Sequence, residues 1–274
     1  FGTVGLINVY DSIYPMTELP KITALRVIQL LPKTTPIANQ PKIGFGDQKS
    51  ARMVLGTVPV EQDGSAYFKL PVDKPVYFQA LDADGVAVQS MRSATYVHPG
   101  ETLTCLGCHN SPTNGYRMGN TSATALRRAP SVIKPDVEGS KPFSFPILVQ
   151  PVLDNNCVAC HTKSTAEGKK CPDLTRGAQT NNGDFFTSYN ALRDFTFFWD
   201  NAVFDNVPDS KPGQIGARNS KLYQMLVKGH HGLKLSKEDL HRLTLWMDCN
   251  SDFYGAYEKL AEQKEGKLVW PALE

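Results

Sequence analysis

The chain has 274 residues, of which 41% are hydrophobic and 20% charged, and its formal net charge is +2. This composition predicts a globular protein of one large domain or two ordinary ones and excludes a disordered chain. A nearly neutral chain offers no strongly basic face, so we expect no nucleic-acid partner. No apolar run approaches the roughly 20 residues of a transmembrane helix. Because the sequence starts at Phe1, with no initiator methionine or signal peptide, we expect a processed chain or a fragment.

Residues 1–100 carry the signals of β structure. The segments "VGLINVY" and "ALRVIQLL" predict two strands, and two later stretches alternate apolar residues around Asp63-Gly64 and Asp84-Gly85. Aspartate followed by glycine is a strong hairpin signal, so each stretch predicts a hairpin. Asp82 and Asp84 in "LDADG" could also bind calcium, but the turn explains them equally well. We predict an antiparallel β-sandwich-like domain over residues 1–110, ending in a first cysteine motif.

Two copies of a cysteine motif, "CLGCH" and "CVACH", hold most of the functional information. Cys105, Cys108 and His109 form the first copy, and Cys157, Cys160 and His161 form the second. C-x-x-C-H is the attachment signal of c-type haem. Its two thiols form thioethers with the two porphyrin vinyl groups, and the histidine that follows can bind the iron. The motifs therefore predict two covalently bound c-type haems, which implies a periplasmic or otherwise extracytoplasmic location.

A zinc site and a redox dithiol are the alternatives to haem. Two C-x-x-C pairs can form a four-cysteine zinc site. In a zinc ribbon roughly 15–20 residues separate the pairs, whereas here residues 109–156 lie between them. A zinc ribbon also gives no reason for a histidine after both pairs. A thioredoxin-like dithiol needs a βαβ context, which the sequence does not offer.

The C-terminal half has a different pattern. Residues 111–145 are rich in Pro, Gly, Ser, Asn and Thr and predict an irregular connection that covers the first haem. In residues 146–274 we predict a short helix entering the second motif, a helix from Ser220 to Gly229, and another that starts at Ser236. The resulting fold class is α+β, with the β-sandwich-like domain followed by a mainly α-helical cytochrome c-like domain.

The axial ligands of the two irons can be predicted in part. His109 and His161 should bind their irons from the proximal side. His230 and His231 lie in a glycine-flanked loop between two predicted helices, where small cytochromes c present the distal ligand, and two solvent-exposed histidines are the alternative. We favour His231 over His230, because it lies further past the helix end. A bis-histidine iron is saturated and suits electron transfer.

The first iron has less certain distal ligands. Tyr116 and His98 lie close to the motif in sequence and are both candidates, although each could instead be an ordinary linker or surface residue. An open iron at this site would permit catalysis. The remaining cysteines, Cys171 and Cys249, most simply form a disulfide in an oxidising compartment, with buried free thiols or ligands of an extra metal as alternatives.

Several long segments resemble the C-terminal half of the hydrazine synthase alpha subunit family. They are the β segment from "GTVPVEQDG" to "AVQSMRS", the following "GETLTCLGCHN", the "LVQPVLDNNCVACH" segment and the stretch from "PGQIGARNSK" to "WMDCNSDFYGAY". The resemblance covers most of residues 50–257. It implies a diheme module in which the Cys105/Cys108 haem is the candidate catalytic one and the Cys157/Cys160 haem is a relay.

Three functions are compatible with the sequence. The first is a periplasmic diheme c-type cytochrome module that carries electrons between redox protein partners or other domains of a larger chain. The second is a haem enzyme domain related to the alpha subunit, with chemistry on small nitrogen compounds at the first haem. The third is a docking role for the β domain. Axial ligation of the first iron separates the first two, because a low-spin iron favours relay and a high-spin iron favours catalysis.

Overall fold

The computed structural model describes residues 1–14, 16–46, 50–108, 123–162, 171–177, 185–199 and 210–272. The chain divides into two compact units that are interleaved along the sequence. Unit 1 contains residues 1–30, 53–136 and 205–215, and unit 2 contains residues 31–52, 137–204 and 216–274. The sequence instead predicts consecutive domains. Among the described residues, no helix has both the length and the apolar character that a membrane span requires.

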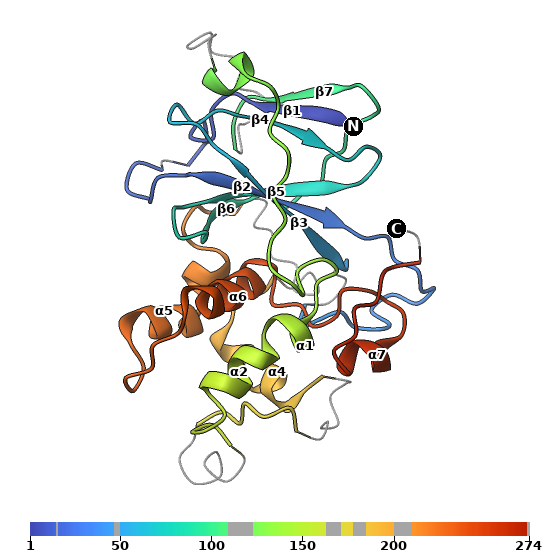
Figure 1. Ribbon diagram of the computed structural model, residues 1–274, viewed down its shortest axis with the longest axis vertical. Coiled ribbons are helices and arrows are strands. Elements are labelled where there is room, and N and C mark those ends of the chain that lie inside the picture. The colour runs from blue at the N-terminus through green and yellow to red at the C-terminus, as the bar shows by residue number, and fades with distance from the viewer. Residues whose placement is uncertain are drawn as a thin grey trace. The chain divides into compact units, whose positions relative to one another are not determined.

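Unit 1 is built around two β-sheets (Figure 1). One sheet has three strands in the order β4-β1-β7, from Ala66–Leu70, Gly2–Leu6 and Thr102–Cys105. The other has four strands in the order β3-β2-β5-β6, from Arg52–Pro59, Ala24–Leu30, Val76–Leu81 and Ala87–Ser90. Apolar side chains of both sheets share one buried core, which makes the arrangement a sandwich.

The prediction of an all-antiparallel sandwich is wrong in one sheet. β1 pairs antiparallel with β4, but it pairs parallel with β7. Parallel strands need a long crossover connection. Here almost the whole sandwich lies between β1 and β7 in the sequence, so the connection is long enough. The parallel register aligns Leu6 with Cys105, which brings the first cysteine motif to the end of β1.

One of the two predicted hairpins is confirmed. β5 and β6 pair antiparallel around the Asp84-Gly85 turn, where Asp82 Oδ1 accepts hydrogen bonds from the backbone of Asp84 and Val86, both at 2.9 Å. The other hairpin is wrong, because the strands on either side of Asp63-Gly64, β3 and β4, belong to different sheets. The same turn chemistry can close a corner between two sheets, so the local signal does not reveal strand pairing.

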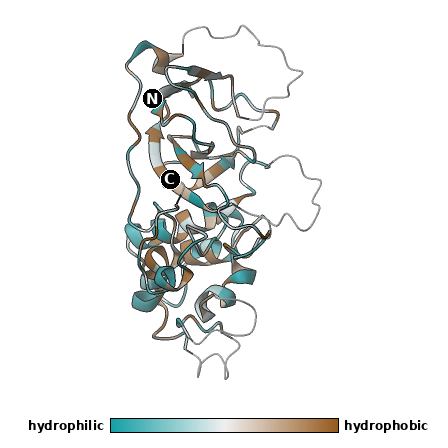
Figure 2. Cartoon of the chain, turned by 90° about the vertical axis from the view of Figure 1, so that its right-hand side faces the viewer, coloured by the Kyte–Doolittle hydropathy of each residue, from teal (hydrophilic) through white to brown (hydrophobic). Residues whose placement is uncertain are grey.

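Unit 2 contains short helices joined by irregular chain. They are α1 (Phe145–Leu148), α2 (Gln150–Asn156), α4 (Thr187–Ala191), α5 (Lys221–Lys228), α6 (Lys237–Asp248) and α7 (Leu260–Lys264). α5 and α6 begin after Ser220 and Ser236, as predicted, and Ser236 accepts a hydrogen bond from the Asp239 backbone at 3.0 Å. Figure 2 shows both hydrophilic and hydrophobic residues on the helical segments of the chain.

The core of unit 2 is a cluster of aromatic rings rather than a packed helix bundle. Phe145 of α1 lies next to Trp246 of α6, with 5.2 Å between ring centroids, and next to Phe253, at 5.3 Å. Tyr189 of α4 lies 5.0 Å from Phe253. Its buried hydroxyl donates to the Ser251 carbonyl at 2.6 Å. Phe253 itself lies outside the helices, so much of this core comes from irregular chain.

The prediction of a mainly α-helical cytochrome c-like domain is therefore wrong. The described helices of unit 2 are short, from 4 residues in α1 to 12 in α6. Pro146 and Pro151 occupy the first turns of α1 and α2, where a missing backbone N–H is tolerated. The helical periodicity of α5 and α6 is real, but it describes two elements and does not extend to the segments that fill the aromatic core.

Candidate functional site

The first cysteine pair is attached to the edge of the sandwich. Cys105 ends β7, and its carbonyl accepts a hydrogen bond from the Ile7 backbone at 2.9 Å. The next carbonyl, that of Leu106, accepts one from Asn8 at 3.2 Å. A Cβ on Gly107 would lie 2.0 Å from the Asp11 carbonyl oxygen, so only glycine fits there. The chain that follows β1 thus holds the first motif close on one side.

A cavity of about 310 Å³ lies inside the sandwich beside this pair. Both sheets contribute to its wall, and both cysteines of the first motif line it. Its apolar wall includes Val4, Leu6, Leu25, Phe68, Phe78, Ala80 and Met91. Gln89, Ser90 and Ser93 also line it. The Gln89 side chain is itself hydrogen-bonded to Ser210, because its amide nitrogen donates to the Ser210 carbonyl and its amide oxygen accepts from the Ser210 hydroxyl, both at 2.9 Å. An apolar hollow with a few polar groups is the usual form of a cofactor or ligand site.

The thiols of the first pair lie in apolar surroundings. Burial raises the pKa of Cys105, and burial together with the nearby Cys105 raises the pKa of Cys108 to about 12. Both thiols are therefore protonated at neutral pH. Apolar surroundings of this kind suit attachment to the edge of an apolar macrocycle.

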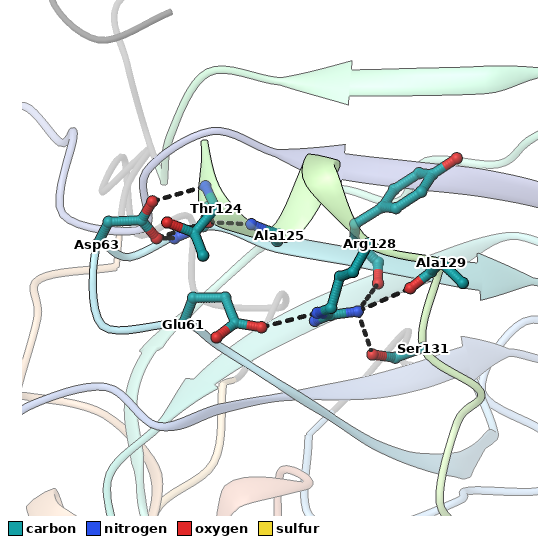
Figure 3. A network of polar contacts seen from close by, with 9 residues as sticks. Glu61, Asp63, Thr124, Ala125, Arg128, Ala129 and Ser131 are labelled. Atoms are coloured by element: carbon teal, nitrogen blue, oxygen red, sulfur yellow. Dashed lines mark hydrogen bonds and ion pairs between the residues drawn. The ribbon is translucent and has the colours of Figure 1, made fainter. Parts of the chain in front are cut away.

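The chain returns to the sandwich after the first motif through a polar network (Figure 3). Asp63 in the corner between β3 and β4 accepts a hydrogen bond from the Thr124 backbone at 2.8 Å, and Ser65 accepts one from Ala125 at 3.0 Å. Arg128 forms an ion pair with Glu61 at 2.8 Å. The described chain on both sides of residues 109–122 is thus attached to unit 1.

Of the three residues predicted to bind the first iron, the structure describes one. His109 and Tyr116 lie outside the described residues. His98 is described, but its side chain is 62% exposed and its Nδ1 lies 3.0 Å from Asp73 Oδ1. It is not among the residues that line the cavity. Sequence reasoning missed Gln89, Ser90 and Met91, because they lie in and directly after a regular strand, β6, and carry no motif.

The second cysteine pair lies on a turn at the end of a helix. α2 ends at Asn156, and Cys157 is its C-cap. The Cys157 carbonyl accepts hydrogen bonds from the backbone of Cys160 at 3.1 Å and of His161 at 3.0 Å, which closes the turn. Burial, together with Asp239 and Cys160, raises the pKa of Cys157 to about 11.

Two histidine rings face one another beside this second pair. The ring centroids of His161 and His230 are 5.9 Å apart, and the ring planes are inclined by 30°. His161 Nδ1 lies 3.0 Å from the Pro172 carbonyl oxygen. Nδ1 must donate that hydrogen bond because a carbonyl oxygen can only accept, and in a neutral imidazole Nε2 is then the nitrogen that can bind a metal. Burial lowers the pKa of His230, as do the nearby His231 and His161, so the neutral, metal-binding form is favoured.

The loop after α5 places its two histidines differently. Gly229 ends the helix with a φ of 97°, and His231 itself has a φ of 47°. His230 is partly buried and contacts His161, whereas His231 is exposed and its recorded ring contact is with His230, at 4.6 Å. The sequence argument favoured His231 for its reach beyond the helix. In the structure, with positive φ angles at Gly229 and His231, the ring of His230 is the one that contacts His161, which favours His230 as the ligand. The spacing of residues in the sequence does not show this.

The remaining two cysteines are not joined. All six cysteines are described, and the structure contains no disulfide between them. Cys249 is buried at the end of α6, and Cys171 is partly buried next to Pro172. Their pairing stays a prediction. Among the described residues there is also no cluster of three or more His, Cys, Asp or Glu side chains that could hold a bare metal ion.

The described residues fit a covalently bound haem at the second pair. Imidazole nitrogens bind metals at about 2 Å. The separation of the His161 and His230 rings therefore matches one metal atom held between them. The hydrogen bond from His161 to Pro172 fixes the orientation of the ring, as second-shell partners of metal ligands do. The cavity next to Cys105 and Cys108 likewise offers apolar cover for part of a macrocycle.

Comparisons with known proteins point to one enzyme. Residues 21–110 match the family model described as "Hydrazine synthase alpha subunit middle domain". Over 119 residues the chain is 30% identical to hydrazine synthase subunit alpha of Kuenenia stuttgartiensis, a match that covers 38% of this chain and 15% of the relative. The solved structure of Kuenenia stuttgartiensis hydrazine synthase is similar in fold, with a TM-score of 0.64 at 19% identity.

These matches cover only part of the relatives, so they support similarity for that part alone. The structural match covers 93% of this chain but 43% of the solved chain, so the present sequence spans less than half of that protein. The family match covers the sandwich except β1 and ends just after the first cysteine pair. The chain is therefore similar to the hydrazine synthase alpha subunit, by the family match over residues 21–110 and in fold over most of its length.

Proposed function

We propose that this chain is a two-haem redox region of an enzyme related to the hydrazine synthase alpha subunit. Cys105 and Cys108 hold one c-type haem, and Cys157 and Cys160 hold the other. The first is the place of chemistry on a small nitrogen compound, and the second carries electrons to or from it. The observation that carries this proposal is the pair of facing imidazoles, His161 and His230, directly beside a C-x-x-C-H motif.

The second site has the properties of an electron relay. When bound, a haem with two axial histidines transfers single electrons and has no open coordination position. The chain contributes rigidity, because His161 is held by Pro172 and the Leu174 backbone donates to the His161 carbonyl at 3.0 Å. We assign His230 as the distal ligand, and His231 becomes an exposed neighbour. Little reorganisation around the iron suits rapid electron transfer.

The first site has the properties of a reaction site. An apolar cavity beside the cysteine pair provides space, and Ser93 in its lining provides a hydroxyl that can hydrogen bond a small ligand. The match to the middle domain of the alpha subunit covers this same part of the chain. Because the relative is named for hydrazine synthesis, compounds with one or two nitrogen atoms are the substrates we favour. An extracytoplasmic location follows from the haem attachment chemistry.

The test is expression in a host that attaches c-type haem in its periplasm. Intact-protein mass should exceed that of the polypeptide by two haem masses. Electron paramagnetic resonance should show one low-spin iron with two histidine ligands and one iron that binds hydroxylamine or nitric oxide. Zinc in place of haem would contradict the whole proposal. Two low-spin irons that bind no small ligand would leave an electron-carrying module without the enzymatic step.

A further inference from the structure

Four lysines surround the loop that carries His230. Residues 221–239 contain Lys221, Lys228, Lys234 and Lys237 and two acidic residues, Glu238 and Asp239, directly after Lys237. The whole chain, in contrast, has 29 basic and 27 acidic side chains. Positive charge is therefore concentrated at the one loop that supplies a ligand candidate for the second site.

The helix before the loop presents two of these lysines on one side. Lys221 and Lys228 are the first and last residues of α5, seven positions apart, so they lie almost in line along the helix. Both are exposed, while Leu222 is buried on the side that packs into unit 2. Val227 is 52% exposed and belongs to the solvent side of the helix. An apolar side chain thus lies among cationic ones.

These lysines are available to an external partner. All four are exposed, and none forms an ion pair with any residue that the structure describes. Elsewhere in unit 2, exposed lysines lie beside acidic side chains: Lys267 pairs with Glu265 at 2.8 Å, and Lys259 pairs with Glu262 at 3.7 Å. Four lysines against Glu238 and Asp239 leave the segment 221–239 with an excess of two positive charges.

We propose that this lysine face, made of Lys221, Lys228, Lys234, Lys237 and Val227, docks an acidic redox protein that exchanges electrons with the second haem. The inference rests on the proposed function, since it takes the Cys157/Cys160 haem to be the relay. Complementary charge steers such encounters and raises association rates at low salt. An exposed apolar centre with a charged rim is the usual composition of a transient interface.

The composition of the face favours a protein over a membrane. Binding in the plane of a lipid surface needs several large apolar residues that enter the acyl boundary. Within residues 221–237, Val227 is the one exposed large hydrophobic side chain. Its neighbour in the loop, His231, is polar and exposed as well. A flat, mostly cationic face with a single aliphatic residue suits a brief electrostatic contact.

The experiment measures electron transfer from a reduced flavodoxin, an acidic one-electron carrier, to the haem-loaded full chain by stopped-flow spectroscopy. The second-order rate constant should fall steeply as salt is raised, because screening shortens the range of the attraction. Replacing all four lysines with glutamine should lower the rate about tenfold at low salt and remove most of the salt dependence. The matched control replaces Lys21, Lys69, Lys134 and Lys211, four exposed lysines of unit 1, with glutamine.

The outcomes separate the docking face from the proposed function. An equal loss of rate in both quadruple variants would show that net charge matters and the face does not. Normal low-spin haem with an unchanged rate in the face variant would overturn the docking proposal and leave the relay intact. If Cys157 and Cys160 carry no haem, the proposed function fails, and flavodoxin binding measured by calorimetry still decides the docking. Preferential binding to phosphatidylglycerol vesicles would overturn it in favour of a membrane surface.

Discussion

The two cysteine pairs are nearly identical in sequence and differ in almost everything around them. The first pair continues a strand. Backbone hydrogen bonds and close packing with residues 7–11 hold it in place, and it lies beside a cavity of about 310 Å³. The second closes a turn after a helix, and two imidazoles already face one another beside it. One setting offers space and the other offers ligands.

Under the proposed function, the motif determines where each haem is attached, and the surroundings of the motif determine the role of that haem. A saturated site passes electrons, whereas a site with free volume can admit a substrate. The same five-residue pattern therefore supports a division of labour between reaction and relay. The predictions below test that division, first at the cysteines and then at the groups that distinguish the two settings.

The largest expected effect is the loss of one haem at a time. Cys157→Ala with Cys160→Ala should remove one haem mass and the low-spin bis-histidine signal together. Cys105→Ala with Cys108→Ala should remove the other haem mass and the ability to bind small ligands. Intact-protein mass spectrometry and electron paramagnetic resonance measure both outcomes. If either double variant lost both signals, the two sites would not be separate in the way we describe.

The next prediction distinguishes His230 from its neighbour. His230→Ala should convert the second iron from low to high spin and allow carbon monoxide to bind, because an axial nitrogen is lost. His231→Ala should keep the low-spin spectrum, since His231 is exposed and its recorded ring contact is with His230. Optical spectra of both variants in the oxidised and reduced states provide the comparison. The opposite pattern would restore His231 as the ligand.

The sequence was sufficient for elements whose signal is local. α5 begins after Ser220 and ends at Gly229, α6 begins after Ser236, and the Asp84-Gly85 hairpin forms, all as predicted. The sequence was insufficient where pairing between strands far apart in the chain determines the structure. Nothing near Asp63-Gly64 reveals that the chain changes sheets there, and nothing near Cys105 reveals its parallel partner in β1.

The candidate site follows the same rule. The C-x-x-C-H motifs and the glycine-flanked histidines could be found by pattern, because covalent attachment and helix termination are local. The cavity could not, because its lining comes from both sheets and from strands far apart in sequence. Choosing between His230 and His231 needed the backbone angle at Gly229. The predicted mainly α-helical domain was wrong because an aromatic core built from irregular chain leaves no periodic pattern in the sequence.

A smaller effect is expected at the glycine of the first motif. Gly107→Ala would place a Cβ 2.0 Å from the Asp11 carbonyl oxygen, and backbone cannot move aside easily. We expect a loss of about 1–3 kcal/mol in the free energy of unfolding. The control is Ala159→Ser in the second motif, an exposed position where we expect less than about 0.5 kcal/mol. Urea unfolding measures both, and equal effects would argue against a constrained first motif.

The smallest effect concerns the polar corner that secures the chain after the first motif. Burial alone would raise the pKa of the Asp63 carboxyl, but hydrogen bonds from Ser65 and Thr124 together outweigh burial and hold the pKa well below its usual range. A carboxyl group with a lowered pKa in the folded state stabilises the protein above its unfolded pKa of about 4 and loses that contribution as the pH falls further.

Asp63→Asn should therefore reduce the free energy of unfolding by about 1 kcal/mol at neutral pH and flatten its fall below about pH 4. Asp84→Asn is the matched control, because Asp84 is an exposed acid in the confirmed hairpin turn and its loss changes net charge equally. Chemical unfolding at a series of pH values gives both curves. The second cysteine pair offers a further check, since its bis-histidine spectrum belongs to unit 2 and should be unchanged in Asp63→Asn at neutral pH. If both aspartate variants flattened the curve alike, the acid sensitivity would reflect net charge, and the hydrogen bonds from Ser65 and Thr124 would not be its source.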